Sequence, residues 1–224
     1  MKGTIIRHLI LKDLRLHRQQ IYITLAAGAV ALGVCQWGSE PALVVGSVWF
    51  FISLIMVGTM LPIGGIVNER KKQNLAFVMS LPVSSVQYTI AKIISTFGMF
   101  LAPWLTLVGA AILVIETRHI IPRGAIPMLL ILAFMPLVAF WVMTAAALIG
   151  ETEGWGIAAN VACSSSYGLI WYFMTRNSAL TAGMTKPAPV WNSAVLTVLG
   201  VEFALAAVLL GLTLYVQSRK QDFV

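Results

Sequence analysis

The chain consists of long apolar stretches separated by short polar ones. The stretches approach or exceed the roughly 20 residues that a membrane-spanning helix needs. Six are predicted, near residues 21–38, 43–67, 86–115, 126–149, 155–174 and 191–216. Gly, Pro and charged residues occupy the breaks between them, as expected of turns outside a membrane. The pattern predicts an all-α integral membrane protein with about six transmembrane helices.

The segment before the first apolar stretch, residues 1–20, is too charged to span a membrane. One helical face gathers apolar residues: Ile6, Leu9, Ile10 and Leu14. Asp13 and His17 also fall within this apolar arc and interrupt it. We expect an N-terminal amphipathic helix that lies along the membrane surface, with its cations near anionic headgroups. A frayed basic leader is the alternative.

Composition supports the membrane assignment. Of 224 residues, 59% are hydrophobic and 10% are charged, whereas soluble domains carry about 25% charged residues. In lipid, only helices and closed barrels satisfy their own backbone hydrogen bonds. The apolar runs are too long and too uniform for barrel strands of about ten alternating residues, so helices are expected.

The net charge of +7 is distributed unevenly between the two predicted sides. It does not indicate nucleic-acid binding, because no dense basic cluster with interleaved aromatics is present. If the N-terminus is cytoplasmic, 11 of the 15 Lys and Arg residues lie on that side. The remaining four are Arg118, Arg123, Arg176 and Lys186. The positive-inside rule therefore predicts that both termini are cytoplasmic.

The break between the second and third stretches, residues 64–82, forms a short amphipathic element. Leu75, Val78 and Met79 make an apolar stripe with Phe77 beside it, and Pro82 ends it. A helix held between two spans by short joints can transmit a push from a soluble motor into both. An ordinary basic cytoplasmic loop is the alternative interpretation.

The same region carries a resemblance to a known family. The run Glu69-Arg70-Lys71-Lys72, the turn Ser80-Leu81-Pro82 and the pair Ala91-Lys92 resemble the signature of type-2 ABC exporter permeases. The opening Leu11-Lys12-Asp13-Leu14 resembles the N-terminal connecting helix of that family. Six spans with both ends inside match its architecture over essentially the whole chain.

The resemblance implies a half-transporter in the bacterial cytoplasmic membrane. Two permease subunits, identical or homologous, would pair and each would bind a separate ABC ATPase that holds ATP and Mg²⁺. The chain itself has no Gly-x-x-x-x-Gly-Lys-Ser/Thr phosphate loop, so no cofactor is expected on it. Residues 69–79 would form the coupling helix, with Glu69, Arg70, Lys71 and Lys72 facing the ATPase. The substrate would be a lipid, an amphiphilic peptide, an antibiotic or a similar hydrophobic solute leaving the cytoplasm.

The implied domain plan has three parts: a connecting helix over 1–20, a transmembrane domain over 21–218 and a cytoplasmic tail over 219–224. Permeases of this family usually pair through the first and fifth spans. Both are rich in small residues, which allow close helix approach in lipid: Gly28, Ala31, Gly33, Ala158, Ala159 and Ala162. These residues could equally pack within one subunit.

Glu202 is the one acidic residue predicted near the middle of the bilayer, where a charge costs about 2.5–3.5 kcal/mol. Three roles are open: a protonated packing residue, part of a translocation path that contacts a cationic substrate, and a proton relay. Asn160, Ser164 and Ser165 are milder candidates for hydrogen bonding between helices or for lining the path.

No enzyme chemistry is predicted. There is no His-Glu-x-x-His metal motif and no Asp in a predicted span, and the three histidines lie outside the spans. We expect no catalytic or metal site. Two rival functions are an ion-coupled transporter or channel that uses Glu202, and a membrane scaffold or sensor that does not transport.

Overall fold

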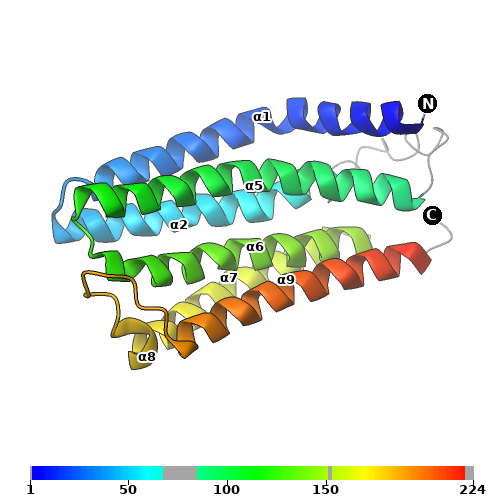
Figure 1. Ribbon diagram of the computed structural model, residues 1–224. Helices are drawn as coiled ribbons and strands as arrows, with labels where there is room; N and C mark the ends of the chain where they lie inside the picture. The colour runs from blue at the N-terminus through cyan, green and yellow to red at the C-terminus, as the bar shows by residue number, and fades with distance from the viewer. Residues whose placement is uncertain (1, 68–84, 151–152, 220–224) are drawn as a thin grey trace.

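The computed structural model describes residues 2–67, 85–150 and 153–219, and this part of the chain is helical without strands. Figure 1 shows long helices that run back and forth along one axis. The elements in chain order are α1 (Lys2–Cys35), α2 (Glu40–Pro62), the π-helix η1 (Ile63–Val67), α5 (Ser85–Arg118), the 3₁₀ turn η2 (Arg123–Ala125), α6 (Ile126–Ile149), α7 (Glu153–Arg176), α8 (Ser178–Thr181) and α9 (Ser193–Arg219).

Four stretches of the described chain are long and apolar enough to cross a membrane. They are Glu40–Ile66, Thr89–Arg118, Arg123–Ile149 and Ser193–Arg219. Each overlaps one of the six stretches predicted from the sequence. The first and fifth predicted spans lie in α1 and α7, which are also long but carry more polar residues. That these two helices also span the membrane stays a prediction.

Helix α1 is continuous from Lys2 to Cys35. No break separates the expected surface helix, residues 1–20, from the first span, because no proline interrupts this part of the chain. The predicted connecting helix and most of the predicted first span are therefore parts of one continuous helix. Helix α1 begins and α9 ends at the same end of the bundle, as Figure 1 shows. That this end is cytoplasmic remains a prediction.

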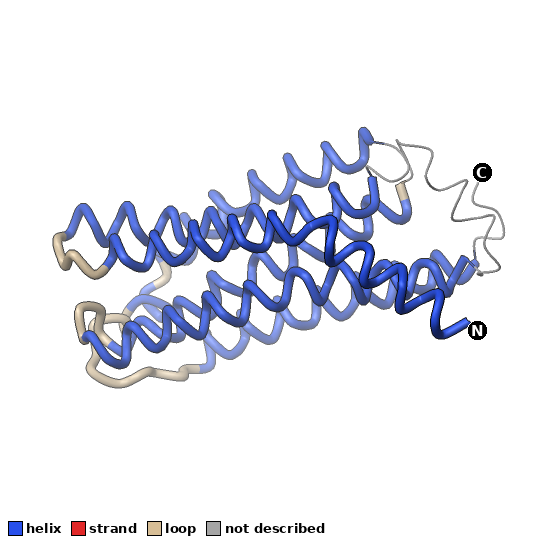
Figure 2. Tube along the Cα trace, turned by 90° about the horizontal axis from the view of Figure 1, so that it is seen from above, coloured by secondary structure: helices blue, strands red, loops and turns tan. Residues whose placement is uncertain are grey.

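The helices pack in two groups, with α1, α2 and α5 in one and α6, α7 and α9 in the other. Helix α1 contacts α2 and α5, whereas α6 contacts α2, α7 and α9 (Figures 1 and 2). Most of the α6 span is buried, while few residues of the α9 span are. At the centre, the rings of Phe100 and Phe140 stack with their centroids 4.9 Å apart. Helix α6 thus forms the centre of the bundle.

A tryptophan of α5 bonds to the backbone of α6 close to a proline. Pro136 has no N–H, so the Leu132 carbonyl four residues earlier lacks its helical donor. Trp104 Nε1, from α5, donates a 2.7 Å hydrogen bond to the Ala133 carbonyl one turn earlier. Neighbouring helices commonly satisfy the backbone near prolines in membranes. This bond fixes the register between α5 and α6.

Candidate functional site

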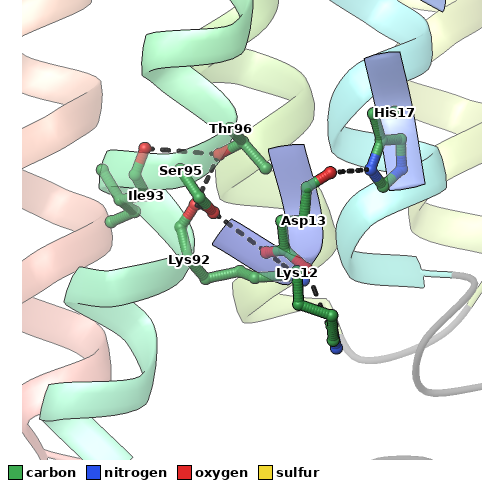
Figure 3. A network of polar contacts seen from close by, with 7 residues as sticks. All are labelled: Lys12, Asp13, His17, Lys92, Ile93, Ser95 and Thr96. Carbon is green, nitrogen blue, oxygen red and sulfur yellow. Dashed lines mark hydrogen bonds and ion pairs between the residues drawn. The ribbon is translucent and has the colours of Figure 1, made fainter. Parts of the chain in front are cut away.

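Polar residues of α1 and α5 meet inside the bundle near the end where α1 begins (Figure 3). Lys92 Nζ donates a 2.8 Å hydrogen bond to Asp13 Oδ2, and each of the two side chains is only 4% exposed. The Ser95 hydroxyl lies 3.0 Å from the same carboxylate oxygen. We call Asp13, His17, Lys92, Ser95 and Thr96 the polar junction. It ties the first helix to the third predicted span.

The polar junction follows from helical spacing on both sides. Asp13 and His17 are four residues apart, so they lie on one face of α1. His17 Nδ1 is 3.1 Å from the Asp13 carbonyl oxygen. On α5, Lys92 and Thr96 have the same spacing, and the Thr96 hydroxyl donates to the Lys92 carbonyl at 2.7 Å. Two polar faces therefore meet in an otherwise apolar interface.

The π-helix η1 packs against the polar junction through two glycines. A Cβ atom on Gly64 would lie 3.1 Å from His17 Nε2, and one on Gly65 would lie 3.1 Å from Thr96 Cγ2. Larger side chains at either position would have to displace the junction. The end of the α2–η1 rod is thus held close to both α1 and α5.

The buried charges make the polar junction sensitive to substitution. Removing water from two charges costs several kcal/mol, which their attraction offsets only when both partners stay in place. Lys12 Nζ lies 3.7 Å from the other carboxylate oxygen of Asp13 and adds a second, exposed cation. By sequence, Lys92 is one of the 11 cations predicted on the cytoplasmic side. The structure instead places it in the interior as the partner of Asp13.

The predicted coupling residues lie outside the described part of the chain: Glu69, Arg70, Lys71, Lys72, Leu75, Phe77, Val78 and Met79. The described helices flank that segment on both sides. Helix η1 ends at Val67, and α5 begins at Ser85, about two turns before Lys92. Both attachment points of the segment therefore adjoin elements that the polar junction contacts.

Comparison with protein families assigns this chain to a family. The family model described as ABC-2 family transporter protein matches residues 8–219, nearly the whole chain. The chain belongs to the ABC-2 transporter family. No curated protein and no solved structure matches it. The predicted resemblance to type-2 ABC permeases is confirmed, and the chain is a membrane transport subunit.

The polar candidates in the predicted spans of this ABC-2 permease occupy different surroundings. Glu202 in α9 is 8% exposed and lines a cavity between α6, α7 and α9. Asn160 is half-buried on α7, whereas Ser164 and Ser165 are exposed on that helix. The structure therefore does not bring the serines together with Glu202. Tyr167, which the sequence analysis did not single out, lines the cavity instead.

The small residues proposed for permease pairing divide between the interior and the surface. In α1, Gly28 packs against Leu107 and Ala31 is fully buried, while Gly33 faces open space. In α7, Ala159 is buried, and Ala158 and Ala162 are exposed. Gly28 and Ala31 therefore have packing roles within one subunit. Pairing through the first and fifth spans stays a prediction.

Proposed function

We propose that this ABC-2 permease is the transmembrane subunit of an ATP-driven exporter. Two copies of it, or this chain and a homologue, form the membrane path, and a separate ABC ATPase binds each copy. ATP and Mg²⁺ are held by those ATPases, because this chain has no phosphate loop of its own. The substrate is a hydrophobic or amphiphilic solute that leaves the cytoplasm.

The observation that supports this proposal is that η1 and α5, the described elements before and after residues 68–84, both contain residues that contact α1 at the polar junction. A motor that binds residues 69–79 pulls or pushes on the ends of η1 and α5. Both elements contact the junction residues of α1, with Gly64 beside His17 and Lys92 bonded to Asp13. A displacement of residues 69–79 would therefore move η1, α5 and α1 together and would not be absorbed by a loop. Packed elements of this kind switch between discrete arrangements more readily than they deform.

Charge is the proposed means of ATPase binding. Arg70, Lys71 and Lys72 follow Glu69 without interruption and supply three consecutive cations. Complementary acidic groups on the ATPase would give orientation and a fast association rate. ATP binding and hydrolysis would then drive the permease between inward-open and outward-open states. The export direction rests on the family resemblance.

The rival function with a structural argument is ion-coupled transport through Glu202. This residue is buried within the apolar part of α9, where acidic residues commonly mark ion pathways. Such a transporter would need no ATPase. The two functions therefore differ in what the chain binds.

The test is purification of the tagged chain from its own membranes in mild detergent. We expect mass spectrometry to find a stoichiometric soluble ATPase and the eluate to hydrolyse ATP in a vanadate-sensitive manner. A permease that elutes alone and without ATPase activity, even after crosslinking, would favour the ion-coupled function.

A charge-reversal variant tests the binding segment itself. Replacing Arg70, Lys71 and Lys72 by Glu should abolish ATPase co-purification while the helices stay folded. The matched control reverses three cations at the opposite end of the bundle, Arg118, Arg176 and Lys186, and should leave the ATPase bound. Full ATPase recovery with the first variant would disprove the assignment of residues 69–79.

A further inference from the structure

Helices α6, α7 and α9 line a cavity of about 330 Å³ that is partly open to the surface. Its walls are mainly apolar and include Met135 and Val138 of α6 and Leu205 of α9. Small-molecule sites are typically pockets of about 300–1,000 Å³ with apolar walls and a few polar groups. The cavity is within this range.

Two polar groups on the cavity wall have no hydrogen-bond partner among the described residues. They are Glu202 Oε2 and the Tyr167 hydroxyl, and both atoms are buried. Glu202 follows the start of α9 by nine residues, which places it roughly 14 Å along the helix and well inside the apolar zone. A third polar residue on the wall, Ser166, already donates a 2.7 Å hydrogen bond to the Ala162 carbonyl. Glu202 and Tyr167 are thus the polar groups of the wall whose hydrogen-bonding capacity the described residues leave unused.

The charge of the cavity specifies the charge of the ligand. Its lining contains one carboxyl group and no Lys, Arg or His. The other deeply buried acid of the described chain, Asp13, is already paired with Lys92, whereas Glu202 takes part in no ion pair there. A single positive charge is therefore the complement of this site.

The size of the cavity and the chemistry of its walls restrict the class of ligand further. A divalent metal ion needs several oxygen or nitrogen ligands, and no group of three His, Cys, Asp or Glu residues occurs in the described residues. A bare proton would not need an apolar chamber. A ligand with an ammonium group and an apolar body can contact the Glu202 carboxyl group, the Tyr167 hydroxyl and the apolar walls at the same time.

We propose that this cavity binds an amphiphilic amine. The ammonium group donates hydrogen bonds to Glu202 and to the Tyr167 hydroxyl oxygen, and the apolar body packs against Met135, Val138 and Leu205. As a statement about the exported substrate, this inference rests on the export function proposed above. As a statement about binding, it concerns this chain alone.

The experiment measures binding to the full permease, without ATPase, in nanodiscs of phosphatidylcholine. The probe is monodansylcadaverine, which joins a primary amine to an apolar fluorophore, and its N-acetyl derivative is the neutral match. We expect fluorescence anisotropy to show about tenfold or more tighter binding of the charged probe, since a hydrogen bond to a charged group contributes about that factor. Equal affinity for the two probes would overturn the proposal.

Variants identify the residues responsible. Glu202→Gln keeps the shape and should abolish the preference for the charged probe, and Tyr167→Phe should weaken binding a few-fold. Glu116→Gln, at an acid that pairs with Arg123 outside the cavity, is the matched control and should bind as the wild type does. A charge preference that survives in Glu202→Gln would also overturn the proposal. The comparison of the two probes on the unaltered chain stays decisive if a variant fails to fold.

The amine could be that of a free solute or that of a phospholipid headgroup. Nanodiscs in which phosphatidylethanolamine replaces part of the phosphatidylcholine distinguish these sources. Competition with the probe assigns the site to the aminolipid, and unchanged binding assigns it to a free solute; both results support an amine site. A permease that binds the amine but purifies without an ATPase would retain this inference and lose the export function. A permease that purifies with an ATPase but binds both probes equally would retain the export function and lose this inference.

Discussion

Lys92 Nζ lies 2.8 Å from Asp13 Oδ2, although 79 residues separate the two in the chain. This contact joins α1 to the beginning of the α5 span. It also explains the two polar residues that interrupt the apolar arc of the N-terminal segment. Asp13 and His17 face the interior because α5 and η1 supply polar and small partners there. Of the residues on this face, Asp13 and His17 are buried, whereas Leu14 is exposed.

Breaking this pair on one side should destabilise the protein. Asp13→Ala leaves the Lys92 ammonium buried without its counter-charge, and such a loss costs about 3–5 kcal/mol. We expect a clearly lower unfolding temperature in detergent, measured by tryptophan fluorescence. The control is Glu40→Ala, which removes an acid at the exposed start of α2 and should shift the temperature little. An unchanged unfolding temperature in Asp13→Ala would show that the pair is not stabilising.

Replacing both partners separates stability from coupling. The double variant Asp13→Leu with Lys92→Met exchanges the ion pair for apolar side chains, a change that is often neutral or stabilising. We expect its unfolding temperature to return close to that of the wild type. If the polar junction transmits motion from the ATPase, transport per ATP hydrolysed should still fall in the double variant. Stable protein with full transport would restrict the junction to a packing role.

The close approach of α2 and α6 depends on Gly58. A Cβ atom at this position would lie 2.9 Å from the Pro136 carbonyl oxygen, a backbone atom that cannot rotate away. Gly58→Ala should therefore destabilise the bundle by about 1–3 kcal/mol through overpacking. Gly109→Ala in α5 is the matched control because its Cβ would meet nothing within 4 Å. Thermal unfolding of the two variants in the same detergent checks the difference, and equal values would contradict this account of the crossing.

The helices were largely predictable because apolar length is a local signal. The predicted stretch 126–149 coincides with α6, and the apolar stretch that contains Glu202 is α9. The continuity of α1 was not predicted, since the charges of its first half suggested a separate surface element. The absence of proline there allows a single helix, and tertiary contacts with α2 and α5 run along it.

The polar junction and the cavity were less accessible from sequence. Periodicity places Asp13 and His17 on one face of their helix, but it does not say which residues of a distant helix lie opposite. Lys92 was accordingly predicted only as one of the cytoplasmic cations, with no partner assigned to it. Glu202 was recognisable from the sequence as an acid within a predicted span. No sequence pattern indicates that Tyr167 of α7 lines the same cavity as Glu202. Which residues of two helices face each other is decided by tertiary packing, and the spacing of residues within one helix does not determine it.

Trp104 should support the proline-containing part of α6. Trp104→Phe removes the indole N–H that donates to the Ala133 carbonyl at 2.7 Å and leaves that buried oxygen without this donor. Losing such a partner costs about 1–3 kcal/mol. We expect a lower unfolding temperature, followed by circular dichroism because the variant changes tryptophan fluorescence. Trp171→Phe removes an indole from a half-exposed position on α7 and should have a much smaller effect. Equal losses in the two variants would mean that ring size, and not the hydrogen bond to α6, determines the effect at Trp104.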